Sequence, residues 1–164
     1  MSNEIKLEKC VSIYTDGSCS QNPGPGGWAF LIRDDSGIIF QKSGGEIYTT
    51  NNRMELTAAV KALSAFFRLN PRPEEALVFT DSQYVKQGIT EWIQNWKYNK
   101  WRTSDKTPVK NRDLWERLDK LAKKSSITWE WVKGHNGNEY NELCDTMARN
   151  ATAAMKTAYP APTS

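Results

Sequence analysis

The alternation of apolar and polar positions in the first quarter of the chain predicts three strands. Residues 11–16 alternate and are rich in β-branched side chains, which favours a strand that ends at Asp16. Residues 28–33 and 38–42 predict two further strands, and the polar residues 34–37 between them predict a turn. Together these segments predict an antiparallel meander.

Asparagine, glycine and proline residues mark the ends of the next elements. Residues 22–27, Asn-Pro-Gly-Pro-Gly-Gly, predict a loop between the first two strands. Apolar residues recur at helical spacing over 56–67 and predict a helix. Asn51 or Asn52 can cap the start of this helix, and residues 70–73, Asn-Pro-Arg-Pro, end it.

Strands and helices alternate in the second half of the chain. A short apolar run over residues 76–81 predicts a strand buried on both faces, and Ser82 is placed to cap the helix that follows. Residues 114–121 predict a further helix, and residues 126–132 a half-exposed edge strand. A last helix is predicted to start near Glu139, with its apolar face formed by Leu143, Met147, Ala148 and Ala151.

The order of these elements predicts an α/β (mixed α+β) fold. A three-strand meander followed by β-α-β units gives a five-stranded mixed sheet with helices packed on both faces. The length of 164 residues predicts one domain, which we place at residues 1–156. Residues 157–164 are predicted to form a mobile tail.

Composition excludes several classes of protein. No apolar run approaches the roughly 18 residues that a membrane span needs, and the N-terminus lacks the pattern of a signal peptide. The three cysteines cannot all pair and do not have the spacing of a zinc site. Reduced thiols predict a cytoplasmic location. Nothing in the sequence indicates a dimer interface, so we expect a monomer.

Basic and aromatic residues are concentrated in one segment, although the net charge of the chain is only +3. Residues 92–112 contain six basic residues, one acidic residue and three of the seven tryptophans. Cations interleaved with aromatic rings indicate a surface that faces a polyanion. The structural alternative is a solvated helix-loop-helix whose tryptophans pack on the body of the protein.

Four acidic residues are predicted to lie at the margin of the core. Asp16 and Asp81 each end a strand near the centre of the predicted sheet, where ligands of α/β proteins bind. Glu55 and Asp145 lie close to the buried sides of their helices. Carboxylates that converge repel one another unless a cation neutralises them, and oxygen ligands suit Mg²⁺.

Each acid also has a purely structural alternative. Asp16 precedes Gly-Ser and suits a turn, and Asp81 with the following serine suits a helix N-cap. Glu55 stands at capping-box spacing from Asn52, and Asp145 suits an ordinary surface position.

His135 is the only histidine and lies in the loop formed by residues 133–137. It precedes Asp145 by ten positions and could shuttle a proton at neutral pH, or be an ordinary loop residue. No serine or cysteine forms a nucleophile pattern with this histidine and an acid. The glycine-rich residues 22–27 lack the Lys-Ser/Thr ending of a phosphate-binding P-loop.

Five motifs, in this order between Val11 and Asn150, resemble those of bacterial-type ribonuclease HI. The motifs are Thr15-Asp-Gly-Ser18, Asn22-Pro-Gly-Pro-Gly-Gly27, Thr50-Asn-Asn-Arg-Met-Glu-Leu56, Thr80-Asp-Ser-Gln-Tyr-Val85 and Trp131-Val-Lys-Gly-His135. The resemblance implies a ribonuclease H-like fold and an endonuclease that cuts the RNA strand of RNA–DNA hybrids. It implies 3′-hydroxyl and 5′-phosphate ends, with roles in primer removal and R-loop clearance.

The same resemblance implies the residues of the active site. Its metal ligands fall on Asp16, Glu55, Asp81 and Asp145, with Asp16 shared between two Mg²⁺ ions that Mn²⁺ can replace. Its mobile catalytic histidine falls on His135.

The resemblance also implies the substrate contacts. Contacts to ribose 2′-hydroxyls fall on Asn22, Asn51 and Gln83, with Cys19 and Asn52 beside them. A DNA-phosphate pocket falls on Thr50 and Asn111, and a basic protrusion on residues 92–111, including Trp92, Lys97, Lys100 and Trp101. Tyr48 departs from the family pattern, because many members have arginine there. The loss of a charge-assisted phosphate contact predicts weaker binding of the hybrid.

Two other functions remain open at this point. A hybrid-binding module would hold the duplex without cutting it, and a nuclease of the same fold would act on DNA, as resolvases and transposases do. The presence of all four acids and His135 favours an enzyme. The complete motif set and the basic segment favour a hybrid substrate.

Overall fold

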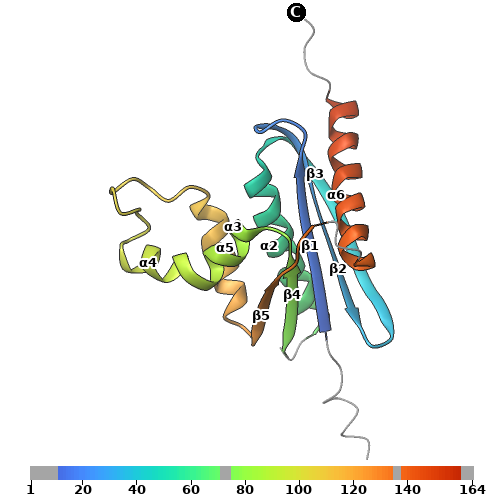
Figure 1. Cartoon of the computed structure of the whole chain (residues 1–164), viewed down its shortest axis with the longest axis horizontal. Helices are drawn as coiled ribbons and strands as arrows, with labels where there is room; N and C mark the ends of the chain where they lie inside the picture. The colour runs from blue at the N-terminus through green and yellow to red at the C-terminus, as the bar shows by residue number, and fades with distance from the viewer. Residues whose placement is uncertain (1–10, 71–74, 135–137, 160–164) are drawn as a thin grey trace, which may run out of the picture.

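Five strands form one mixed sheet in the order β3-β2-β1-β4-β5 in the computed structural model, which describes residues 11–70, 75–134 and 138–159 (Figure 1). The first three strands form the antiparallel meander, β4 pairs parallel with β1, and β5 pairs parallel with β4 at the sheet edge. These features confirm the predicted fold class. The strands are β1 (Val11–Cys19), β2 (Gly24–Asp34), β3 (Gly37–Thr49), β4 (Ala76–Thr80) and β5 (Ile127–Trp131).

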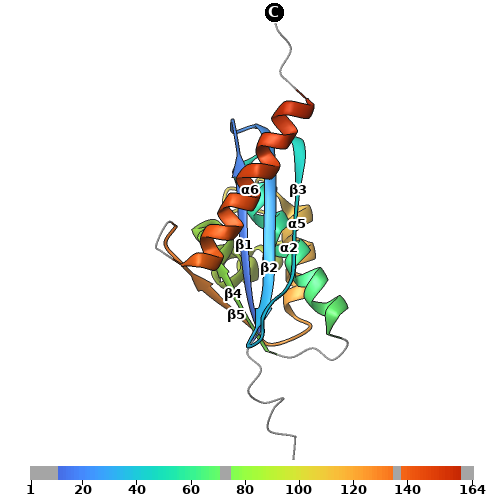
Figure 2. The same ribbon diagram turned by 90° about the vertical axis from the view of Figure 1, so that its right-hand side faces the viewer.

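Helices cover both faces of the sheet. One face carries α2 and α5, and α6 crosses the other face over β1 and β2 (Figures 1 and 2). The segment between α4 and α5 projects from the body of the protein (Figure 1). In the described ranges, every helix is too short or too polar to cross a membrane. The helices are α2 (Asn51–Leu69), α3 (Gln83–Gln87), the π-helical turn η1 (Gly88–Trp92), α4 (Ile93–Tyr98), α5 (Arg112–Ala122) and α6 (Glu139–Ala158).

The core lies mainly between the sheet and α2. Successive residues of a strand point to opposite faces, so Ile13 packs on the α2 side while Tyr14 packs on the α6 side. Phe66 of α2 and Trp115 of α5 are fully buried in the larger cluster. Each such side chain stabilises the fold by about 1.5–3 kcal/mol.

The glycines of residues 22–27 differ from the prediction of a loop. Gly24 begins β2, and Gly26 and Gly27 pair with the end of β1. A Cβ atom at Gly27 would lie 2.5 Å from the carbonyl oxygen of Ala148 in α6. The glycines therefore allow the backbone of α6 to lie directly on β2. Glycine within a strand often marks such a close approach of another backbone.

The ends of two helices and the buried face of one also differ from the predictions. The cap of α2 is Thr50, whose side chain accepts a hydrogen bond from the backbone N–H of Arg53, so the prediction of Asn51 or Asn52 is wrong. Ser82 caps α3, as predicted. Helix α6 continues to Ala158, so residues 157 and 158 are helical rather than part of a tail. Its buried stripe is shifted from the predicted face and consists of Asn141, Cys144, Ala148 and Thr152.

The predicted burial of β4 on both faces is wrong for one face, whereas the predicted exposure of β5 is confirmed. Ala76, Val78 and Thr80 of β4 are buried, but Leu77 and Phe79 are half-buried, so only one face of this strand is fully covered. Strand β5 is a half-exposed edge strand, as predicted.

Candidate active site

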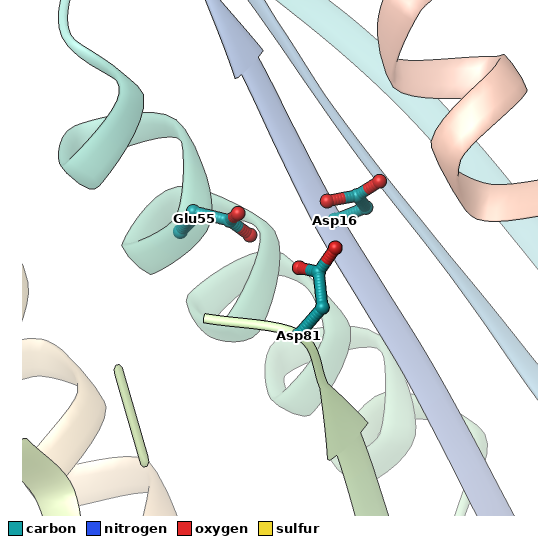
Figure 3. Close-up of side chains that lie close together, drawn as sticks. All are labelled: Asp16, Glu55 and Asp81. Carbon is teal, nitrogen blue, oxygen red and sulfur yellow. The ribbon is translucent and has the colours of Figure 1, made fainter. Parts of the chain in front are cut away.

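Asp16, Glu55 and Asp81 converge at one edge of the sheet (Figure 3). Each offers a carboxylate oxygen, and these oxygens lie within 4.8 Å of one another. Asp16 comes from β1 and Asp81 directly follows β4, and the parallel pairing of these strands brings their carboxyl ends together. Glu55 reaches the same point from α2.

Gly17 allows Glu55 to approach Asp16. A Cβ atom at Gly17 would lie 2.4 Å from the backbone nitrogen of Glu55, so only glycine permits α2 to pack this closely on β1. Asp81 is held from the other side, because Trp131 donates a hydrogen bond from Nε1 to its carbonyl oxygen at 3.0 Å. Backbone packing therefore brings the three carboxylates together, and the backbone N–H of Gly17 also donates a hydrogen bond to Asp16 Oδ1 at 2.9 Å.

We expect Gly17→Ala to impair activity and stability together. The added methyl group must push α2 away from β1, which costs about 1–3 kcal/mol as overpacking does. Displacement of Glu55 by 1 Å can lower the rate by about 10²-fold. Urea unfolding and hybrid cleavage would measure both effects, with Ser20→Ala at an exposed position as the control. Unchanged stability and activity would contradict the proposed role of the close approach.

The structural alternatives for these acids fail. Strand β1 continues to Cys19, so Asp16 does not form a turn. Thr50 caps α2, so Glu55 does not complete a capping box. The hydroxyl of Ser82, and not the Asp81 carboxylate, accepts the capping bond of α3.

Burial and mutual repulsion disfavour the charged state of these acids and raise their pKa values. Burial raises the pKa of Asp16 to about 8, and the charges of Asp81 and Asp145 add to this effect. Burial, followed by the charges of Asp16 and Asp81, raises the pKa of Glu55 well above its ordinary value. The pKa of Asp81 is also raised, mainly by burial.

The donor set suits a hard divalent cation. Glu55 Oε1 and Asp81 Oδ1 are buried without a hydrogen-bond partner in the described part of the chain. Unpaired buried carboxylate oxygens are costly, and a cation with oxygen ligands would satisfy them. The cluster therefore fits a divalent metal ion such as Mg²⁺.

Asp145 lies beside this group on α6 but does not belong to the three-acid cluster. Its charge and a side-chain hydrogen bond both raise the pKa of Asp16, so the two carboxyl groups are neighbours. Arg149, one turn later on α6, pairs with Asp145 at 2.9 Å. Sequence reasoning missed Arg149, although the i,i+4 spacing of an acid and a base on a helix is a recognisable signal.

His135 lies outside the described residues. Its neighbour Gly134 lies close to the cluster, because a Cβ atom built there would be 3.3 Å from Asp81 Oδ2. The assignment of His135 stays a prediction.

Several predicted substrate-binding residues lie around the start of α2. Asn22 Oδ1 accepts a hydrogen bond from the backbone nitrogen of Asn51 at 3.0 Å. Cys19 Sγ lies 3.4 Å from the carbonyl oxygen of Thr49, next to the cap residue Thr50. These bonds join the β1–β2 turn to the N-terminus of α2, where Asn51 and Asn52 are exposed. Gln83 is exposed at the start of α3.

The basic segment, residues 92–112, has features of both interpretations of its composition, a surface that faces a polyanion and a structural element whose tryptophans are packed. Trp92, Trp96 and Trp101 form a row of neighbouring rings, with centroids 5.9 Å and 6.3 Å apart, and all three are half-buried. Lys97 is paired with Asp119 at 3.2 Å, so its charge is partly neutralised. The tryptophans therefore pack against one another within the segment, and several exposed cations, which form no ion pair with the described residues, are available to a polyanion. These cations are Lys100, Arg102 and Lys106, which line a hollow of about 590 Å³.

The chain is similar to ribonucleases H in sequence and in structure. Residues 8–153 match the sequence pattern of the RNase H family. The ribonuclease H of Jannaschia sp. (strain CCS1) is 53% identical over 148 residues, which cover 88% of this chain and 92% of the relative. LC9-RNase H1, a type 1 RNase H of known crystal structure, shares 28% identity and a TM-score of 0.80 over 90% of this chain and 74% of its own. LC11-RNase H1, solved in complex with an RNA/DNA hybrid, shares the fold at 21% identity and a TM-score of 0.68, over 88% of this chain and 97% of its own.

Proposed function

This chain belongs to the ribonuclease H family and is a ribonuclease H enzyme, and we propose that it hydrolyses the RNA strand of RNA–DNA hybrids by two-metal-ion catalysis. The convergence of Asp16, Glu55 and Asp81, with unpaired buried carboxylate oxygens, carries this proposal. Asp145 is a neighbour of Asp16 and is the fourth acid available to the site. The proposed products end in 3′-hydroxyl and 5′-phosphate groups.

The four acids would hold two Mg²⁺ ions, and Mn²⁺ could substitute for them. When bound, the ions supply an activated water and stabilise the departing 3′ oxygen of the scissile phosphate. Asp16, Glu55 and Asp81 fix the ligand positions through the packing of β1, α2 and β4. Arg149 forms an ion pair with Asp145 at 2.9 Å and so fixes this carboxylate on α6. His135 would accept or relay a proton and assist release of the product.

Discrimination between hybrid and other duplexes requires contacts to both strands. A 2′-hydroxyl is the group that distinguishes RNA from DNA, and Asn22, Asn51 and Gln83 can both donate to it and accept from it. Thr50 and Asn111 would hold a DNA phosphate, and Trp92 would line the channel for the DNA strand. Phosphate and sugar contacts carry no base information, so sequence preference should be slight.

The exposed cations of the projecting segment would contribute to affinity through phosphate neutralisation, which makes binding sensitive to salt. Tyr48 is exposed on β3, where it offers no charge to a phosphate. Weaker hybrid binding than in relatives with arginine there stays a prediction. We further propose that the chain acts as a cytoplasmic monomer in primer removal and R-loop clearance, through a single domain whose last helix ends at Ala158.

An end-labelled RNA strand tests this proposal in several duplex contexts. We expect Mg²⁺-dependent cleavage of the RNA annealed to DNA, and none of RNA duplex, single-stranded RNA or DNA duplex. EDTA should stop the reaction. Tight, salt-sensitive binding without cleavage would instead indicate a hybrid-binding module, and cleavage of a DNA duplex or junction would indicate a DNA nuclease of the same fold.

A further inference from the structure

Asn111 is the N-cap residue of α5, but its side chain does not cap the helix. The residue adopts a left-handed backbone conformation with φ 62° and ψ 27°. Its carboxamide is instead held between two other elements. Oδ1 accepts a hydrogen bond from Arg53 Nη1 at 3.1 Å, and Nδ2 donates one to the hydroxyl of Tyr84 at 3.0 Å.

Both partners of this carboxamide are themselves fixed. Arg53 makes a two-pronged ion pair with Asp113, with N–O distances of 2.8 Å and 3.1 Å, which joins the first turn of α2 to the first turn of α5. The Tyr84 hydroxyl accepts a second hydrogen bond at 3.1 Å from Nε1 of Trp115, a fully buried side chain. Neither partner can therefore move freely away from Asn111.

The chemistry of arginine decides which way the carboxamide points. A guanidinium group can only donate hydrogen bonds, so the amide oxygen of Asn111 must face Arg53. A flipped carboxamide would place its NH₂ group against the Arg53 donors. The NH₂ group is thus directed away from Arg53, and only one of its two hydrogens is used on Tyr84. Among the described residues, neither the other hydrogen nor the backbone N–H of Asn111 has a hydrogen-bond acceptor.

We propose that Arg53 is a positioning residue that presents the amide donors of Asn111 to a phosphate of the DNA strand. This inference rests on the proposed function, in which Asn111 belongs to the DNA-phosphate pocket. Without the Arg53 donors, the carboxamide can flip and turn its oxygen toward the phosphate. Arg53 then acts on substrate affinity through Asn111, although it lies only two positions before Glu55.

Arg53→Met removes the donors but keeps an unbranched side chain of similar length. We expect the KM for the hybrid to rise about tenfold, the size typical of lost supporting contacts, while kcat stays within about twofold. Arg53→Lys keeps a group that can only donate and should recover most of the affinity. Arg117→Met removes an exposed cation from α5 and is the matched control. Thermal unfolding of each variant would ensure that the assay temperature lies below all transitions.

A double-mutant cycle separates positioning from direct contact. In an Asn111→Ala background, Arg53→Met should have no further effect on KM. An equal loss in both backgrounds would overturn the proposal, because Arg53 would then act independently of Asn111. A fall in kcat at constant KM would also overturn it and would indicate an effect through Glu55. Failure of the proposed function is distinguishable, since the unmodified protein itself would then not cleave the hybrid.

Discussion

Asp81→Asn is expected to lower the Mg²⁺-dependent rate of hybrid cleavage by roughly 10³-fold, the equivalent of about 4 kcal/mol of transition-state stabilisation. The substitution keeps the size of the side chain but removes one negative charge from the three-acid cluster. Asp81 Oδ1 is buried and has no hydrogen-bond partner among the residues that the structure describes, so this atom is available to bind a cation. Single-turnover cleavage of an end-labelled hybrid would measure the loss.

The control for Asp81→Asn is Asp35→Asn, which removes an acid from the exposed turn between β2 and β3. We expect the control to cleave at the normal rate. Binding of the hybrid by Asp81→Asn should persist, because the proposed substrate contacts lie on other residues. Near-normal turnover of Asp81→Asn in Mg²⁺ would show that the metal assignment is wrong.

Asp16→Asn is expected to stabilise the metal-free protein although it inactivates the enzyme. Burial raises the pKa of Asp16 to about 8 in the folded state, whereas an unfolded aspartate titrates near its ordinary value of 3.8. Between these two values the folded state binds more protons than the unfolded state. The stability of the metal-free protein should therefore fall as pH rises through this range, by at most about 1.4 kcal/mol per pH unit from this group.

Urea unfolding in EDTA at several pH values would test this expectation. At pH 7 we expect Asp16→Asn to be more stable than the unmodified protein by a few kcal/mol, with the difference shrinking toward pH 4. Mg²⁺ should stabilise the unmodified protein and have little effect on the variant. The expectation would fail if Asp16→Asn were less stable than Asp35→Asn in EDTA at pH 7.

Local sequence patterns were sufficient to predict the sheet and two of the acids. Asp16 and Asp81 were found because each ends an apolar or alternating run, and the parallel pairing of those runs brings them together. Glu55 was placed near the core because the spacing of the apolar residues defines the buried face of its helix, and Glu55 lies next to that face. These features depend on short segments, whose periodicity can be read directly.

Features that depend on contacts between distant elements could not be predicted in the same way. The glycines of residues 22–27 indicated a loop, but they form part of β2 because the backbone of α6 lies against them. The same contact with the sheet decides which residues of α6 are buried. The buried stripe therefore differs from the face that the apolar residues of this helix predicted. The orientation of Asn111 depends on Arg53, 58 positions earlier, and no local pattern connects the two.

The proposed catalysis depends on a divalent-metal site formed by Asp16, Glu55 and Asp81. Titration of metal-free protein with Mg²⁺ at pH 7, with proton release and heat recorded together, measures whether these residues bind the ion. Because the pKa values of these acids are raised, we predict saturable binding with net release of protons, and loss of both signals in Asp16→Asn. Binding that does not saturate, or that is unchanged in Asp16→Asn, would contradict the claim.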